Sequence, residues 1–269
     1  MKISKKLLFL IGIFVVVIVG AILVSSQSST INIVGSTSVQ PTAEKLVEVY
    51  SESHKDSKIN VQGGGSSVGI KSAKDGSAQI GTSSKELDDG EKEGLKTYEL
   101  GKDGIVIGVN NENEVSDLSK DQLKGIFSGE IKNWNEIGGN DAEIHVVTRE
   151  DGSGTLDAFE SIIMGDSKIK DDAIVQSSTE AVKQSVSQDP NAIGFVSFAH
   201  MSDDVKTVSV NNVAPSEETI ADNSYELQRP FLFITKGEPT DEVKKFIDWV
   251  MSDEGSKVLQ EEKIIKSSN

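Results

Sequence analysis

Short apolar runs rich in β-branched residues alternate along the chain with segments whose apolar residues recur every three or four positions. The first pattern is typical of buried strands, and the second of amphipathic helices. The predicted strands are 31–34, 59–61, 79–81, 105–109, 144–147, 193–198 and 231–234. The predicted helices are 43–53, 68–74, 120–127, 156–164, 180–187 and 241–251. This alternation predicts an α/β fold with mainly parallel sheets.

Local signals support two of the helix starts and suggest how the chain is divided. Ser119 and Gln122 form a capping box, and Thr240 is placed to cap the last predicted helix. Two strands, one near 105–109 and one near 225–235, are positioned to cross between two sheets. The predicted domains are therefore 27–108 together with 226–269, and 109–225.

The first 26 residues have a different character from the rest. Lys2, Lys5 and Lys6 precede an uncharged apolar run from Leu7 to Val24. This order is typical of a secretory signal or of an N-terminal membrane anchor, and both interpretations stay open. The positive-inside rule places the lysines in the cytoplasm and the remainder outside, on the outer face of the cytoplasmic membrane or secreted after cleavage.

Composition excludes several classes of function. The net charge is −16, and −19 without the three N-terminal lysines, which disfavours a nucleic-acid partner because such proteins need a basic surface. The chain has no cysteine, which excludes disulfides, thiolate metal sites and a lipid-modified cysteine. Three scattered histidines and the absence of dinucleotide or P-loop motifs predict no metal and no cofactor.

Four predicted strands end in loops rich in Gly, Ser and Thr that lead into helices or turns. These loops are 35–38, 63–67, 81–84 and 149–155. In open α/β sheets, ligands bind at the carboxyl ends of strands, and a helix N-terminus with free N–H groups attracts an anion. Taken singly, each serine or threonine is also an ordinary helix cap. Together the four loops predict a cage for a small oxyanion.

One of the two arginines strengthens this interpretation. Arg149 opens the fourth loop in a chain that otherwise carries 25 lysines. A planar guanidinium fits an oxyanion through two parallel hydrogen bonds, which an ammonium group cannot do. The alternative for Arg149 is a surface ion pair with Glu150 or Asp151, and Arg229, just before Pro230, is interpreted as structural.

The sequences of the four loops resemble those of the phosphate-binding proteins of high-affinity ABC phosphate importers. The matching stretches are Gly-Ser-Thr-Ser-Val-Gln-Pro at 35–41, Gly-Gly-Gly-Ser-Ser-Val-Gly-Ile at 63–70, Ile-Gly-Thr-Ser-Ser-Lys-Glu-Leu at 80–87 and Arg-Glu-Asp-Gly-Ser-Gly-Thr at 149–155. The resemblance extends over nearly the whole chain from Ile31. It implies a two-domain, cleft-type fold like that of type II periplasmic binding proteins, with two crossing strands between the domains.

The resemblance also implies a set of phosphate ligands and a mode of action. The implied ligands are Thr37, Ser38, Ser66, Ser84, Arg149, Ser153, Gly154 and Thr155. The protein would capture inorganic phosphate between its domains and deliver it to the permease of an ABC transporter, as a monomer that contacts the membrane through its N-terminal segment. Such a receptor is not an enzyme.

One position departs from the family pattern. Better-known members carry an aspartate at the end of the third loop, where it accepts the proton of hydrogen phosphate, and this chain has Ser84 there. We expect Asp103 to take that role, with Asp151 or Ser84 itself as alternatives. The resemblance also implies that Asp151 holds Arg149 in place.

Two other functions fit parts of the sequence. A cage of hydrogen-bond donors also suits a receptor for sulfate, molybdate or tungstate. The stretch 65–69 matches the Gly-x-Ser-x-Gly motif of serine hydrolases, with Ser67 as nucleophile and His145 or His200 as the base.

Overall fold

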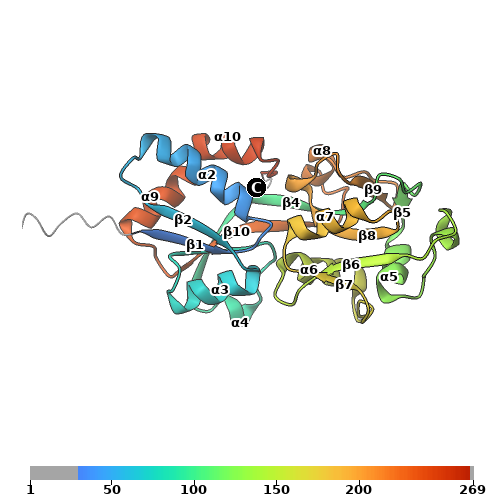
Figure 1. The fold of residues 1–269 in the computed structure, drawn as a ribbon. Helices are drawn as coiled ribbons and strands as arrows, with labels where there is room; N and C mark the ends of the chain where they lie inside the picture. The colour runs from blue at the N-terminus through green and yellow to red at the C-terminus, as the bar shows by residue number, and fades with distance from the viewer. Residues whose placement is uncertain (1–29, 267–269) are drawn as a thin grey trace, which may run out of the picture.

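The computed structural model describes residues 30–266, which form two halves joined through one continuous mixed sheet (Figure 1). The strand order is β2-β1-β3-β10-β4-β8-β6-β7, with β9 paired to β4 and β5 paired to β9. The strands are β1 (Ile31–Gly35), β2 (Ile59–Gly63), β3 (Ile80–Ser83), β4 (Leu95–Val109), β5 (Asp117–Leu118), β6 (His145–Arg149), β7 (Ile174–Gln176), β8 (Ala192–Ser197), β9 (Lys206–Val210) and β10 (Gln228–Lys236).

Helices cover both halves of the sheet (Figure 1). In the first half they are α2 (Gln40–Ser53), α3 (Ser66–Asp75), α4 (Asp89–Lys92), α9 (Asp241–Val250) and α10 (Asp253–Glu261). In the second half they are α5 (Lys120–Ser128), α6 (Gly154–Phe159), α7 (Thr179–Gln188) and α8 (Glu217–Ala221), with short helical turns at Trp134–Ile137, Glu160–Met164 and Phe198–His200.

The first half has its core on both faces of the sheet. Leu46 of α2 and Phe246 of α9 pack with Ile33 of β1 in one apolar cluster. On the other face, Ile70 of α3 packs with Ile234 of β10. Strands β2, β1 and β3 are parallel, so the loops that follow them emerge at the same edge of the sheet.

The second half repeats this layered arrangement. Phe159 of α6 stacks on Phe195 of β8 at the centre of its larger core, and Phe127 of α5 packs against both rings at a tilt. Val182 and Val186 of α7 belong to a smaller cluster on the opposite face. Strand β6 runs parallel to β7 and β8, which places its carboxyl end beside the start of α7.

Strand β4 is the main connection between the halves. Its first ten residues pair antiparallel with β10, and 105–109 pair antiparallel with β8 in the second half. The chain returns through 225–227, where the Ile105 amide donates to the Leu227 carbonyl (2.7 Å) and the Tyr225 hydroxyl to the Ile105 carbonyl (2.8 Å). The connection near 105–109 is therefore a strand, whereas the return near 225 is a short paired segment before β10.

Every predicted strand and helix has a counterpart, although the limits differ, and the Ser119–Gln122 capping box forms as predicted. The predicted helix 156–164, for example, is α6 followed by the π-helical turn Glu160–Met164. The sheet is mixed rather than mainly parallel, because β4 and β10 run antiparallel to their neighbours. Among residues 30–266, no helix has the length and apolar character needed to span a membrane. The predicted anchor or signal, residues 1–26, lies outside the described residues.

Candidate functional site

Hydroxyl side chains from both halves meet around one arginine. Five loops contribute: those after β1, β3 and β6, and those that open α3 and α7. The hydroxyl cluster, as we call it, consists of Ser36, Thr37, Ser38, Ser66, Ser84, Thr155 and Thr179. All but Thr37 are at most 3% exposed. Thr37, Ser38, Ser66, Ser84 and Thr155 were predicted, and the fold brings them together.

One branch of the cluster links the two halves through Arg149. The guanidinium donates through Nη2 to Thr37 Oγ1 (3.1 Å) and through Nη1 to Thr179 Oγ1 (3.3 Å). Ser38 Oγ lies 2.7 Å from Thr179 Oγ1 and 3.0 Å from Thr155 Oγ1. Hydrogen bonds therefore connect Arg149 to the hydroxyls of both halves.

The other branch surrounds Ser84, which is completely buried. Ser36 Oγ donates to Ser84 Oγ (2.9 Å), and the Ser84 amide donates to Ser66 Oγ (3.0 Å). The hydroxyls of Ser66 and Ser84 lie 3.4 Å apart. The residue that occupies the position of the missing aspartate is thus held by two other serines.

Arg149 forms an ion pair with Glu150, one of the two partners considered, but this pair is not a surface one because only 3% of Arg149 is exposed. Its carboxylate partner is Glu150, which accepts from Nε at 2.8 Å and from Nη2 at 2.9 Å. The expectation that Asp151 makes this contact was wrong. Asp151 follows one residue later in the turn and is exposed.

The start of α6 brings the two halves into close contact. Ser153 Oγ caps this helix by accepting from the Leu156 amide (3.3 Å). A Cβ at Gly154 would lie 2.3 Å from Ser66 Oγ and 2.9 Å from Ser84 Oγ, so no larger residue fits here without displacing these serines. Nearby, the Ser67 amide donates to the Gly152 carbonyl (3.1 Å).

An ion pair crosses between the halves beside this contact. Lys85 Nζ lies 3.0 Å from Asp157 Oδ2 of α6 and 3.1 Å from Glu91 Oε1 of α4. Burial opposes the charge on Lys85, but the two carboxylates together raise its pKa. The ammonium group is therefore shared by one carboxylate from each half.

Four helices begin at the cluster. Thr37 and Ser38 precede α2, Ser66 opens α3, Thr155 lies in the first turn of α6, and Thr179 opens α7. The N-terminus of a helix carries a partial positive charge and unpaired N–H groups. The site therefore presents donors and positive helix ends, while Glu150 balances the formal charge of Arg149.

Asp103 lies in a separate set of contacts. It is fully buried, and its Oδ2 accepts from Nε (3.2 Å) and Nη2 (3.1 Å) of Arg229. Its Oδ1 accepts from the Ser197 hydroxyl (2.8 Å) and the Ala199 amide (3.1 Å). Burial lowers the pKa of Arg229, and Asp103 counteracts this effect. These four contacts occupy the carboxylate, so we no longer assign Asp103 as the proton acceptor.

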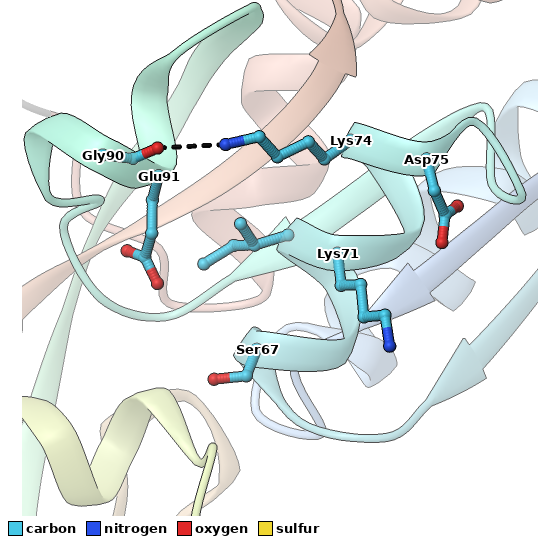
Figure 2. Close-up of a pocket in the computed structure, with 7 residues that line it drawn as sticks. Ser67, Lys71, Lys74, Asp75, Gly90 and Glu91 are labelled. Carbon is cyan, nitrogen blue, oxygen red and sulfur yellow. Dashed lines mark hydrogen bonds between the residues drawn. The ribbon is translucent and has the colours of Figure 1, made fainter.

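Ser67, the proposed hydrolase nucleophile, lies elsewhere. It lines a groove of about 400 Å³ between α3 and α4, shown in Figure 2, together with Lys71, Lys74 and Glu91. The lining of this groove includes no histidine. His145 Nδ1 is paired with Asp189, and His200 Nε2 donates to the Ser38 carbonyl. Neither histidine is placed to act as a base for Ser67.

Two members of the cluster were not among the predicted residues. Ser36 belongs to the first predicted loop, but its side chain was not assigned a role. Thr179 lies in a fifth loop, before the predicted helix 180–187, and a Ser-Ser-Thr sequence at 177–179 was the only signal for it. No strand was predicted before that loop, so it did not match a pattern that begins at the end of a strand.

Comparison with known proteins shows which family this chain resembles along its length. The model of the PBP superfamily domain matches residues 24–254. The phosphate-binding protein PstS of Bacillus subtilis (strain 168) is 34% identical over 238 residues, which are 86% of this chain and 78% of that protein. The phosphate-binding protein PstS of Staphylococcus aureus (strain USA300) is 31% identical over 242 residues, 82% and 73% of the two chains.

A solved structure is also similar along most of the chain. It is that of a putative phosphate ABC transporter substrate-binding protein with bound phosphate from Clostridium perfringens, with 40% identity and a TM-score of 0.87. The match covers 89% of this chain and 100% of that one. This chain therefore belongs to the PBP superfamily and, within it, to the PstS-type phosphate-binding proteins, which are solute-binding receptors and not enzymes.

Proposed function

We propose that this protein captures inorganic phosphate at the hydroxyl cluster and passes it to the permease of an ABC phosphate transporter. The observation that carries the proposal is the convergence of buried hydroxyls from both halves on Arg149, in a chain whose relatives are named for phosphate. The proposed ligands are Thr37, Ser38, Ser66, Ser84, Arg149, Ser153, Gly154 and Thr155.

The donors of the site suit an oxyanion. Arg149 has five N–H donors, and four of them are paired within the described residues. The remaining N–H, the hydroxyls and the amides at the helix starts supply further donors. Hydrogen bonds from charged or dipolar donors to an anion are the strong ones, which favours tight binding of a small tetrahedral anion.

Ser84 is our candidate for the group that receives the proton of hydrogen phosphate. Ser36 Oγ accepts from the amides of Ser38 (3.2 Å) and Val39 (3.4 Å), so its own hydrogen goes to Ser84 Oγ. A hydroxyl has two lone pairs. In one arrangement Ser84 donates to Ser66, and the second lone pair of Ser84 can accept the proton of hydrogen phosphate. In the other arrangement Ser66 donates to Ser84, and Ser84 donates its own hydrogen to the anion.

This exchange of roles has a consequence for selectivity. The pair of Ser66 and Ser84 serves a protonated and an unprotonated anion equally, whereas a carboxylate repels an anion that brings no proton. We therefore expect weaker discrimination against sulfate than a carboxylate would give. Ser84→Asp should widen the preference for phosphate over sulfate, measured by titration calorimetry with both anions. An unchanged ratio would contradict the role of Ser84.

The two halves are proposed to act as domains that close over phosphate. The proposed limits are 27–108 with 226–269, and 109–225, and the hinge would be β4 together with 225–227. Hinge closure around a ligand brings loops of both domains onto it. Small-angle scattering should give a smaller radius of gyration with saturating phosphate, and an unchanged radius would argue against this motion.

The family and the N-terminal sequence support a proposal for where the protein works. PstS-type proteins work outside the cytoplasm, and we propose that residues 1–26 either anchor this chain to the outer face of the membrane or are removed. We further propose that it works as a monomer. Detergent partitioning of the mature protein from membranes, with N-terminal sequencing, distinguishes anchoring from cleavage.

Titration calorimetry of residues 27–269 with phosphate, sulfate and molybdate tests the main proposal. We expect phosphate to bind most tightly. Sulfate or molybdate binding as tightly as phosphate, or more tightly, would favour a receptor for those oxyanions. The absence of binding heat with phosphate would refute the proposal. Ester hydrolysis by the parent protein that is lost in Ser67→Ala would instead support the serine hydrolase hypothesis.

A further inference from the structure

Thr179 contacts three of the proposed phosphate ligands. Its Oγ1 accepts from Arg149 Nη1 (3.3 Å) and lies 2.7 Å from Ser38 Oγ, and its amide donates to Thr37 Oγ1 (3.4 Å). The side chain is 3% exposed and lies at the start of α7. It reaches the cluster from a fifth loop that contributes none of the proposed ligands.

The helix itself does not use the Thr179 hydroxyl. The N-cap of α7 is Ser178, whose Oγ accepts from the Ala181 amide (3.1 Å). Helix capping thus accounts for Ser178 and leaves the buried Thr179 side chain without a role in α7. Its hydrogen bonds go entirely to residues of the site.

Hydrogen-bond direction gives Thr179 a specific effect. A guanidinium only donates, so Thr179 Oγ1 is the acceptor of the Arg149 contact, and its single hydrogen is free for Ser38 Oγ. Ser38 and Thr155 then share one hydrogen bond at 3.0 Å, which leaves one of their two hydrogens to donate outwards. In this arrangement Arg149 donates to Thr179, Thr179 donates to Ser38, and one hydroxyl hydrogen of Ser38 or Thr155 remains to donate to a ligand.

We propose that Thr179 is a positioning residue of the phosphate site, which holds the Arg149 guanidinium in place and leaves one hydrogen of the Ser38–Thr155 pair to donate to the anion. This inference rests on the proposed function. Without the hydroxyl, Arg149 Nη1 loses its acceptor, and Ser38 loses the donor that orders its own hydrogen.

The test compares three variants by phosphate calorimetry and thermal unfolding. Thr179→Val keeps the shape and removes the hydroxyl, and we expect phosphate binding at least tenfold weaker, equivalent to about 1.4 kcal/mol. Thr179→Ser keeps a hydroxyl, and its loss of phosphate affinity, expressed as log Kd, should be at most half of the loss in Thr179→Val. Ser178→Ala is the matched control: it removes the helix cap next to Thr179, so it should lower the melting temperature and leave the affinity within threefold of the parent.

The outcomes separate this inference from the proposed function. A parent protein that binds no phosphate overturns the proposed function, and the role of Thr179 with it. If the parent binds, a loss below tenfold in Thr179→Val, or a Thr179→Ser protein that recovers less than half, overturns the role of Thr179 alone. An affinity loss in Ser178→Ala as large as that in Thr179→Val would also overturn it, because the effect would then belong to the helix. Should the valine variant fail to fold, Thr179→Ala takes its place with the same thresholds.

Discussion

The exchange Arg149→Lys tests the central contact of the proposed site. In the structure the guanidinium reaches Thr37, Thr179 and both oxygens of Glu150 from a buried position. A lysine offers one nitrogen, so it cannot keep both oxygens of Glu150 together with Thr37 and Thr179 and still donate to an anion, as the remaining N–H of Arg149 can. Losing one hydrogen bond to a charged group costs about 1.5–3 kcal/mol, which predicts phosphate binding weaker by roughly 10- to 150-fold.

Titration calorimetry with phosphate gives the affinity, and circular dichroism confirms that the variant is folded. Arg229→Lys is the matched control, because it makes the same exchange at the chain's other arginine, which is equally buried but is paired with Asp103. We expect the control to lower stability while the affinity stays within threefold. An Arg149→Lys protein that binds within a factor of two of the parent would refute the assignment. Equal losses in both variants would mean that the effect is global.

Three further variants and one control variant test neighbouring features. Gly154→Ala places a methyl group 2.3 Å from Ser66 Oγ, so phosphate binding should weaken by roughly tenfold, since one or two hydrogen bonds are disturbed; unchanged affinity in calorimetry would mean that the halves do not meet here. Asp103→Asn leaves Arg229 buried without its charge partner and should cost about 3–5 kcal/mol in urea unfolding, far more than a surface exchange. Asp157→Asn removes the ion pair between the halves and should weaken phosphate binding by roughly two- to fivefold. Glu91 faces Lys85 from the same half, so Glu91→Gln should leave the phosphate affinity unchanged. Equal losses of affinity in Asp157→Asn and Glu91→Gln would contradict a role of the Lys85–Asp157 pair in closure of the two halves.

The loops of the site were predictable because their signal is local. A strand that ends in Gly, Ser or Thr before a helix exposes amides and hydroxyls at a sheet edge, whatever the rest of the chain does. The loops that carry Ser38, Ser66 and Thr155 were found this way, whereas these residues themselves were implied by the family resemblance, and the parallel order of β1, β2 and β3 brings the first loops together. The strand that precedes Thr179 is β7, which has three residues and is too short for a periodic signal.

The errors concern partners that depend on tertiary structure. Asp103 precedes a glycine, which suggested a loop position, but it lies within β4 directly opposite Arg229 of β10. That register joins residues 126 positions apart, and no local pattern specifies it. Glu150 and Asp151 are adjacent acids in one turn, so which of them faces Arg149 is decided by the backbone direction after β6. The first part of β4 was missed because its residues 96–99 are partly exposed and polar, as expected where one face meets solvent.

The strongly acidic composition of the chain is compatible with an anion site because the two act over different distances. Surface charges are screened by salt beyond about 8–10 Å, whereas buried hydroxyls and helix ends act on the anion at contact. The net charge, −16 for the whole chain and −19 for the residues after 26, therefore slows the approach of phosphate more than it weakens the bound complex. Added salt should accordingly raise the association rate of phosphate, measured by stopped-flow on the residues after 26, with a smaller effect on dissociation. An association rate that falls with salt would mean that a positive field guides the anion, and that the acidic surface faces away from the path of entry.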